Sequence, residues 1–132
     1  MVEVRALATD AVIVKDRHVL LLERDHPPFE GAWVLPGGLV EPDETAREAC
    51  RRETREEVGL PVEIEAFVGL YDDPDRDERG NVSAAYRCRP VGSESPTPEE
   101  EARQIDWFDP ATLPEMGFDH ETIVLDAFTR EP

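Results

Sequence analysis

Three glutamates in the stretch from residue 44 to residue 57 have the spacing needed to hold a metal ion. On an α-helix at 100° per residue, the side chains of Glu53, Glu56 and Glu57 fall within one narrow wedge. Ionised carboxylates about 6 Å apart repel one another by on the order of 3 kcal/mol per pair at an effective dielectric of about 20. Oxygen ligands without a soft ligand nearby suit a hard divalent cation, Mg²⁺ or Mn²⁺, which would relieve this repulsion.

The residues around these glutamates predict a helix from Ala46 to Val58. Thr45 and Glu48 have the spacing of a capping box, and Gly59 is a residue type favoured just past a helix end. The glutamates must therefore be positioned by this helix and by whatever packs beside it.

Small apolar residues lie on nearly the same side of this helix as the glutamates. Ala46, Ala49 and Cys50 are expected to face the protein, whereas the arginines at positions 47, 51 and 55 lie on another side. A run of charges in an acidic protein is usually a solvated face. Here the packed side of the helix, the isolated Glu44 and the preceding glycines favour a site instead.

The segment from Gly38 to Leu60 resembles the Nudix box, G-x5-E-x7-R-E-U-x-E-E-x-G-U with U a bulky aliphatic residue. The matching residues are Gly38, Glu44, Arg52, Glu53, Glu56, Glu57, Gly59 and Leu60. Thr54 stands where an aliphatic residue is usual, and we expect it at the edge of the packed face without loss of activity. The resemblance implies a MutT-like, metal-dependent hydrolase of nucleoside diphosphates linked to another group.

The resemblance also implies roles for individual residues. The metal ligands would be Glu53, Glu56, Glu57 and the carbonyl of Gly37, with Gly38, Glu44 and Arg52 around them to orient them. The general base is a glutamate inside the box in some relatives and lies on a loop before the last strand in others. The residues that we expect to carry the chemistry are Glu53, Glu56, Arg52 and Glu101. Glu101 is chosen over Glu99 and Glu100 as an extra metal ligand or as the base, and the alternative for all three is a solvated acidic loop.

Segments outside the box are similar to a subgroup of ADP-ribose pyrophosphatases. They are Pro28–Glu41, Tyr71–Gly80 with its Pro74, and Phe118–His120. This similarity implies hydrolysis of ADP-ribose to AMP and ribose 5-phosphate. The alternatives are a pyrophosphohydrolase for oxidised or non-standard nucleoside triphosphates and a non-catalytic ADP-ribose sensor.

Candidate substrate contacts come from the loops on either side of the box. Arg24 and Arg76, or Arg79 in place of Arg76, are placed to meet phosphate or ribose, and Phe29 is placed to stack on a base. The alternatives are a surface arginine, a salt-bridged turn and simple packing. For Trp33 we favour packing.

Composition limits the class of protein. The chain has 132 residues and is 39% hydrophobic, enough for a single domain spanning residues 1–132. It has neither a long apolar run nor a signal-peptide pattern near its start, so we expect a cytoplasmic protein without a membrane partner. Cys50 and Cys88 are expected to be small buried residues. A homodimer is compatible with the resemblance.

Charge adds a second limit. The net charge of −17 makes nucleic acid an unsuitable partner and leaves a small nucleotide, bridged by metal, as the expected one. Lys15 is the sole lysine in the sequence, and such an acidic, lysine-poor chain suggests adaptation to high salt. Circular dichroism across a salt series tests this; a fold that stays intact in low salt without divalent ions would count against it.

The remaining pattern predicts an α/β fold, an α/β/α sandwich around a central mixed sheet, which is also the order of the Nudix fold. The predicted strands are Val2–Val14, Val19–Glu23, Val62–Tyr71, Asn81–Arg89 and Arg103–Phe108. A turn is predicted at Lys15–His18, a Gly-Gly turn at Gly37, and a flexible loop at Val91–Glu100. A final helix is predicted from an Asp119 cap to about Arg130, with Ile123, Val124, Ala127 and Phe128 on its apolar side.

Overall fold

The computed structural model describes residues 2–129, which form one mixed β-sheet with a helix on each face. The strands are β1 (Leu7–Lys15), β2 (His18–Arg24), β3 (Trp33–Val34), β4 (Gly37–Leu39), β5 (Val62–Tyr71), β6 (Val82–Pro90) and β7 (Ala102–Phe108). The helices are α1 (Ala46–Val58), α2 (His120–Thr129) and a short 3-10 helix, η1 (Pro110–Thr112). The strand order is β3-β2-β1-β6-β5, with β4 also paired to β1 and β7 to β2.

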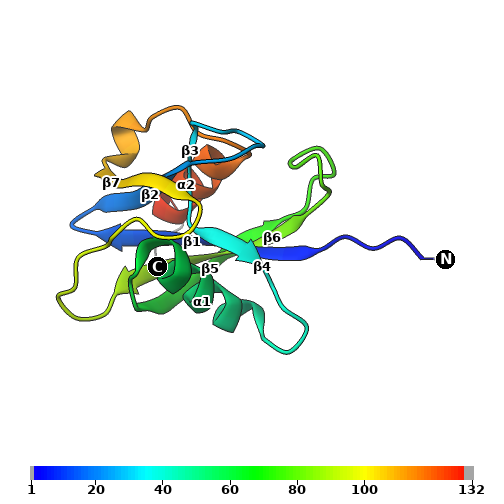
Figure 1. Cartoon of the computed structure of the whole chain (residues 1–132), viewed down its shortest axis with the longest axis horizontal. Helices are drawn as coiled ribbons and strands as arrows, with labels where there is room; N and C mark the ends of the chain where they lie inside the picture. Colours follow the sequence, from blue (N-terminus) through cyan, green and yellow to red (C-terminus); the bar gives the residue numbers. More distant parts are fainter. Residues whose placement is uncertain (1, 130–132) are drawn as a thin grey trace.

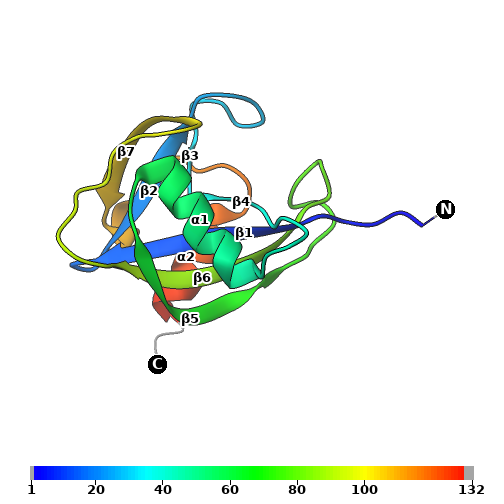
Figure 2. The same ribbon diagram turned by 60° about the horizontal axis from the view of Figure 1, so that its bottom comes forward.

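The two long helices cover opposite faces of the sheet (Figures 1 and 2). Side chains of β1 alternate between the two faces, as the period of a strand requires. Ile13 joins an apolar cluster with Val58 of α1, whereas Val12 joins another with Ile123 of α2. The pair β1–β6 is parallel and the other strand pairs are antiparallel. The expected α/β/α sandwich with a mixed sheet is therefore confirmed.

The first two strands form the expected hairpin. Lys15 pairs with His18, so Asp16 and Arg17 make a two-residue loop in which both residues have positive φ, 50° and 64°. This backbone matches the right-handed twist of the flanking strands. The predicted turn is confirmed.

The predicted start of the first strand is wrong. β1 begins at Leu7, where it meets the first residue of β6, and not at Val2. Val2 and Val4 are 82% and 85% exposed, and the chain before β1 extends away from the sheet (Figure 1). An apolar sequence indicated a strand there, but no partner strand reaches that far.

The glycines after Pro36 also differ from the expected turn. Gly37 and Gly38 lie in β4 and pair with Asp10 and Thr9 of β1. β3 pairs with β2 and β4 pairs with β1, so Leu35 and Pro36 carry the chain from one strand to the next. We call the segment Leu35–Gly37 the crossing.

Helix α1 has the predicted bounds and both predicted caps. Thr45 and Glu48 form the reciprocal capping box, and Gly59 ends the helix in the left-handed region at φ 69°. Thr54 is fully buried rather than at the edge of the packed face, and its hydroxyl donates to the carbonyl of Cys50 at 2.8 Å. That bond explains how a polar side chain is tolerated where an aliphatic one is usual.

The second cysteine lies close to the first. Cys88 of β6 and Cys50 of α1 are both buried, with their Sγ atoms 3.9 Å apart in the core. Tyr86 and Ala84 join them in the same apolar cluster. No helix in the described part of the chain is long and apolar enough to cross a bilayer.

Helix α2 starts one residue after Asp119, as predicted, but the aspartate is used differently. Its two carboxylate oxygens accept hydrogen bonds from Arg76, each at 2.8 Å. Ile123, Val124 and Ala127 are buried as expected, and Phe128 packs beside them. The predicted end at Arg130 lies outside the described residues.

Candidate functional site

A pocket of about 370 Å³ opens beside α1 and is bordered by β1, β4 and the loops before β3, β6, β7 and α2. Its acidic wall contains Glu53, Glu56 and Glu57 of α1, with Glu100 and Glu101 on the facing loop. The structure therefore brings the predicted glutamates together on the packed side of the helix. Arg47, Arg51 and Arg55 are exposed on another side, as the helical phase predicted.

Arg52 is the centre of a hydrogen-bond network beside these carboxylates. Its Nη2 and Nε donate to both oxygens of Glu44 at 2.6 and 3.1 Å, and its Nη1 donates to Glu53 and Glu56 at 2.8 and 3.0 Å. Bidentate pairing of this kind fixes orientation as well as charge. The pairing with Arg52 lowers the pKa of Glu44. The same pairing, together with the bonds to Glu56 and Glu53, raises the pKa of Arg52.

Glu57 is the most buried carboxylate of the acidic wall, at 5% exposed. Burial raises its pKa well above the ordinary value, and the nearby charges of Glu53 and Glu101 add to this rise. The backbone N–H of Gly37 donates to the Glu57 carboxylate at 2.7 Å, and this hydrogen bond partly opposes the rise in pKa. Glu57 thus joins α1 directly to the crossing.

Glu53 lies against the backbone of β4. A Cβ placed on Gly38 would stand 2.4 Å from the carboxyl carbon of Glu53, and one on Gly37 would stand 2.1 Å from the carbonyl oxygen of Thr9. Only glycine allows both close approaches. Burial raises the pKa of Glu53, although the hydrogen bond from Arg52 opposes this.

The loop before β7 is docked on the end of α1. Backbone N–H groups of Thr97, Glu99 and Glu100 donate to the carbonyls of Val58, Glu57 and Glu56, at 2.9, 2.9 and 3.3 Å. These carbonyls are the ones that a helix end leaves without intrahelical partners. The second half of the loop predicted to be flexible is therefore held in place.

This docking brings Glu101 to the pocket. Glu101 has φ 64°, an uncommon conformation for a residue other than glycine, and it follows the docked segment directly. Glu100 also borders the pocket. Backbone of this kind is found at many functional sites, and Glu101, which is exposed, stays a predicted site residue.

Arginine side chains make another part of the pocket lining cationic. The guanidinium carbons of Arg24 and Arg79 lie 5.4 and 5.5 Å from the centre of the Phe118 ring, and Phe29 packs on the same ring at 4.7 Å. Burial and the charge of Arg79 lower the pKa of Arg24. His26 supports Arg24 through a 3.0 Å contact from Nη2 to its Nε2. Phe29 is 49% exposed, whereas Trp33 packs on Phe108 as expected.

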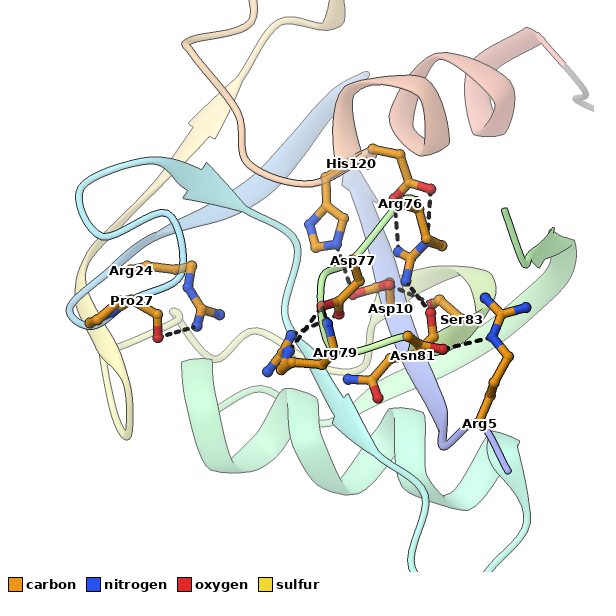
Figure 3. Close-up of polar contacts among 12 residues, drawn as sticks. Arg5, Asp10, Arg24, Pro27, Arg76, Asp77, Arg79, Asn81, Ser83 and His120 are labelled. Atoms are coloured by element: carbon orange, nitrogen blue, oxygen red, sulfur yellow. Dashed lines mark hydrogen bonds and ion pairs between the residues drawn. The ribbon is translucent and has the colours of Figure 1, made fainter. Parts of the chain in front are cut away.

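Arg76 borders the pocket but is held by protein groups. Besides its two bonds to Asp119, it donates to the carbonyl of Asn81 at 3.0 Å, and its side chain is 5% exposed (Figure 3). Of the two arginines in this loop, Arg79 is the one with an exposed side chain, at 50%. The structure therefore makes Arg79 the better candidate for a substrate contact.

Two further residues of the pocket, Asp10 and His120, were not among the predicted site residues. Asp10 of β1 is 6% exposed and accepts a hydrogen bond from the hydroxyl of Ser83, and Nε2 of His120 lies 3.4 Å from it (Figure 3). Burial raises the pKa of Asp10, but His120 and Ser83 together bring it below the ordinary value. A lone aspartate inside an apolar strand was the signal that could have revealed this site.

The acidic wall has the chemistry of a divalent-cation site. Among the described residues no group of three acidic, histidine or cysteine side chains stands close enough to chelate an ion as it lies, since Arg52 draws Glu53 and Glu56 to its Nη1. Glu57 and Glu53, however, are hard oxygen donors held out of water beside one another. A cation would relieve the repulsion between these two carboxylates, so the residues fit the metal that the sequence implied.

Comparisons with known proteins show which family this chain is similar to. The family model described as the Nudix domain matches residues 4–127. The ADP-ribose pyrophosphatase of Methanocaldococcus jannaschii is 42% identical over 122 residues, covering 92% of this chain and 72% of that protein.

Solved structures show the same fold. The Nudix domain of Shewanella oneidensis NrtR in complex with ADP ribose superposes with a TM-score of 0.82 at 25% identity, covering 98% of this chain and 90% of that one. A MutT/Nudix family protein from Enterococcus faecalis gives 0.84 at 28% identity; it covers 98% of this chain, which spans 63% of that protein. Nudix hydrolases generally use divalent metals. The chain described here belongs to the Nudix hydrolase family.

Proposed function

We propose that the protein hydrolyses ADP-ribose to AMP and ribose 5-phosphate with Mg²⁺, or Mn²⁺, as its cofactor. The observation that carries this proposal is that one pocket is lined both by carboxylates and by arginines. Glu53, Glu56 and Glu57 line it together with Arg24 and Arg79. A diphosphate between two sugars needs both, because the carboxylates can hold a metal ion and the arginines can bind phosphate oxygens.

The metal would be held by Glu53, Glu56 and Glu57 together with the carbonyl of Gly37. When bound, it supplies neutralisation of phosphate oxygens and lowers the pKa of a bound water. The proteins with similar sequence or fold include an ADP-ribose pyrophosphatase and an ADP-ribose complex, which supports this substrate over a triphosphate.

The chain's own residues complete the arrangement. Arg52, fixed by Glu44, sets the orientation of Glu53 and Glu56. Arg24 and Arg79 bind diphosphate oxygens, and the exposed face of Phe29 stacks on the base. Glu101, next to the segment docked on α1, takes the proton from the attacking water; a glutamate of the helix is the alternative base.

The test is product release from a nucleotide panel with Mg²⁺ in high salt. The panel contains ADP-ribose, the common nucleoside triphosphates and their oxidised forms, with chelator-treated protein as the control. Faster turnover of ADP-ribose, at higher kcat/KM than any triphosphate, is the expected result. Preferential hydrolysis of triphosphates would keep the site and discard the substrate. Binding of ADP-ribose without hydrolysis would instead indicate a sensor.

A further inference from the structure

The crossing carries the chain from β3 to β4, and its backbone groups are held by both helices. Leu35 N–H donates to Nδ1 of His120 at 3.0 Å, at the start of α2. Two residues later, Gly37 N–H donates to Glu57 of α1 at 2.7 Å. Between them, the carbonyl of Pro36 accepts from Ala11 N–H at 2.9 Å.

The N–H of Leu35 needs a side-chain acceptor because the strand pairing is interrupted at this residue. β3 ends at Val34 and β4 starts at Gly37, so Leu35 lies where pairing changes from β2 to β1. Leu35 is 2% exposed, and an unpaired N–H at such a place is costly. The imidazole of His120 therefore replaces a strand as the acceptor.

The bond to Leu35 defines the state of the His120 ring. Because Nδ1 accepts, the ring proton must lie on Nε2, which faces Asp10 at 3.4 Å. Asp10 is held in turn by the Ser83 hydroxyl, and both residues are buried (Figure 3). The carboxylate thus selects the tautomer whose other nitrogen can hold the crossing.

We propose that His120, oriented by Asp10, is a positioning residue that fixes the crossing and thereby places Gly37 against Glu57. The role rests on the proposed function only for its effect on turnover. His120 acts through the backbone of residues 35–37, at the opposite end of this segment from the acidic wall. Loss of the Leu35 bond would free the end of the segment that α1 does not hold.

Two substitutions separate the nitrogens of His120. In His120→Asn the side-chain oxygen takes the place of Nδ1, and Leu35 keeps an acceptor. In His120→Gln the polar group reaches the place of Nε2, and Leu35 loses its acceptor. His18→Gln, at the exposed first residue of β2, is the matched control.

Amide hydrogen exchange of Leu35 and Gly37, in metal-free protein, reads the crossing directly. We expect slow exchange in the wild type, in His120→Asn and in His18→Gln, and faster exchange at both amides in His120→Gln. Turnover should follow: His120→Gln lowers kcat roughly tenfold with KM for the nucleotide nearly unchanged, and His120→Asn restores most of it.

Equal exchange and equal kcat in the two His120 variants would overturn the proposal, because the ring would then only fill space. A wild type that hydrolyses no nucleotide would remove the proposed function, yet the exchange of Leu35 and Gly37 would still decide whether His120 holds the crossing. Fast exchange of Leu35 in the wild type would refute it without any enzyme assay.

Discussion

Helices α1 and α2 both send side chains into one pocket, but their partners are spread very differently along the chain. Arg52 of α1 finds Glu44, Glu53 and Glu56 within eight residues. Beside α2, His120 bonds to Leu35, 85 residues away, and Asp119 bonds to Arg76, 43 residues away. The first set lies within one short segment, from Glu44 just before the helix to Glu56 within it, whereas the second exists only once the sheet has formed. Contacts between residues that lie close together in the chain can be predicted from a sequence, whereas contacts between distant segments cannot.

The largest expected effect lies on the α1 side. Glu57→Gln keeps the volume and can still accept from Gly37 N–H, but it removes a charge from the acidic wall. Activity should fall by more than about 100-fold, since even outer partners of metal ligands are worth roughly 10–100-fold. Steady-state kinetics, with circular dichroism to show an intact fold, is the measurement. Near-normal turnover would remove Glu57 from the ligand set.

The second effect tests the loop docked on α1. Glu101→Gln should lower kcat about 100-fold if Glu101 is the base, within the range of general base catalysis. Glu99→Gln is the matched control: Glu99 lies in the same loop, and its backbone N–H, rather than its side chain, bonds to α1. An unchanged kcat for Glu101→Gln would move the base to a glutamate of the helix.

The third effect is on stability and belongs to the α2 side. Arg76→Gln breaks the buried pair with Asp119, and the free energy of unfolding should fall by about 3 kcal/mol. Arg79→Gln removes the half-exposed partner of the buried Asp77, but the backbone N–H of residue 79 still donates to Asp77, so the cost should be less than about 1 kcal/mol. Urea titration measures both. A large loss of kcat at unchanged stability for Arg76→Gln would make Arg76 the substrate contact that the sequence suggested.

The smallest effect is a pH dependence of stability without metal. Burial raises the pKa of Glu57, so the native state binds more protons than the unfolded chain between the two pKa values. The contribution of Glu57 is thus most favourable below the unfolded pKa and is lost as pH rises through the folded one.

Asp10 has a lowered pKa and acts oppositely: its contribution to stability is present above the unfolded pKa and is lost as pH falls through the folded one.

Because the charged form of Glu57 is disfavoured in the fold, Glu57→Gln should raise the unfolding temperature in chelator at neutral pH, and the gain should disappear in acid. Thermal scans across pH provide the check. No gain at neutral pH would show that the Glu57 charge is already balanced without metal.

The sequence allowed the helix α1, its caps, the glutamate wall and the sandwich to be predicted, because periodicity and capping are local. It did not allow the crossing to be placed. Gly37 and Gly38 indicated a turn, whereas their role is close approach to Thr9 and Glu53, which no local pattern reveals. Arg76 and Arg79 were equivalent in the sequence, and only the position of Asp119 separates them.

The loop between β6 and β7 has two halves with different tolerance to change in length. Residues 91–95 are exposed, and a Cβ on Gly92 would meet nothing within 4 Å, so added residues there would cost only loop entropy, about 0.6 kcal/mol per doubling. Thr97 to Glu100 cannot shift without releasing the carbonyls of α1. A fluorescent reporter or peptide tag inserted after Gly92 would therefore leave the docked segment and the pocket beside it undisturbed.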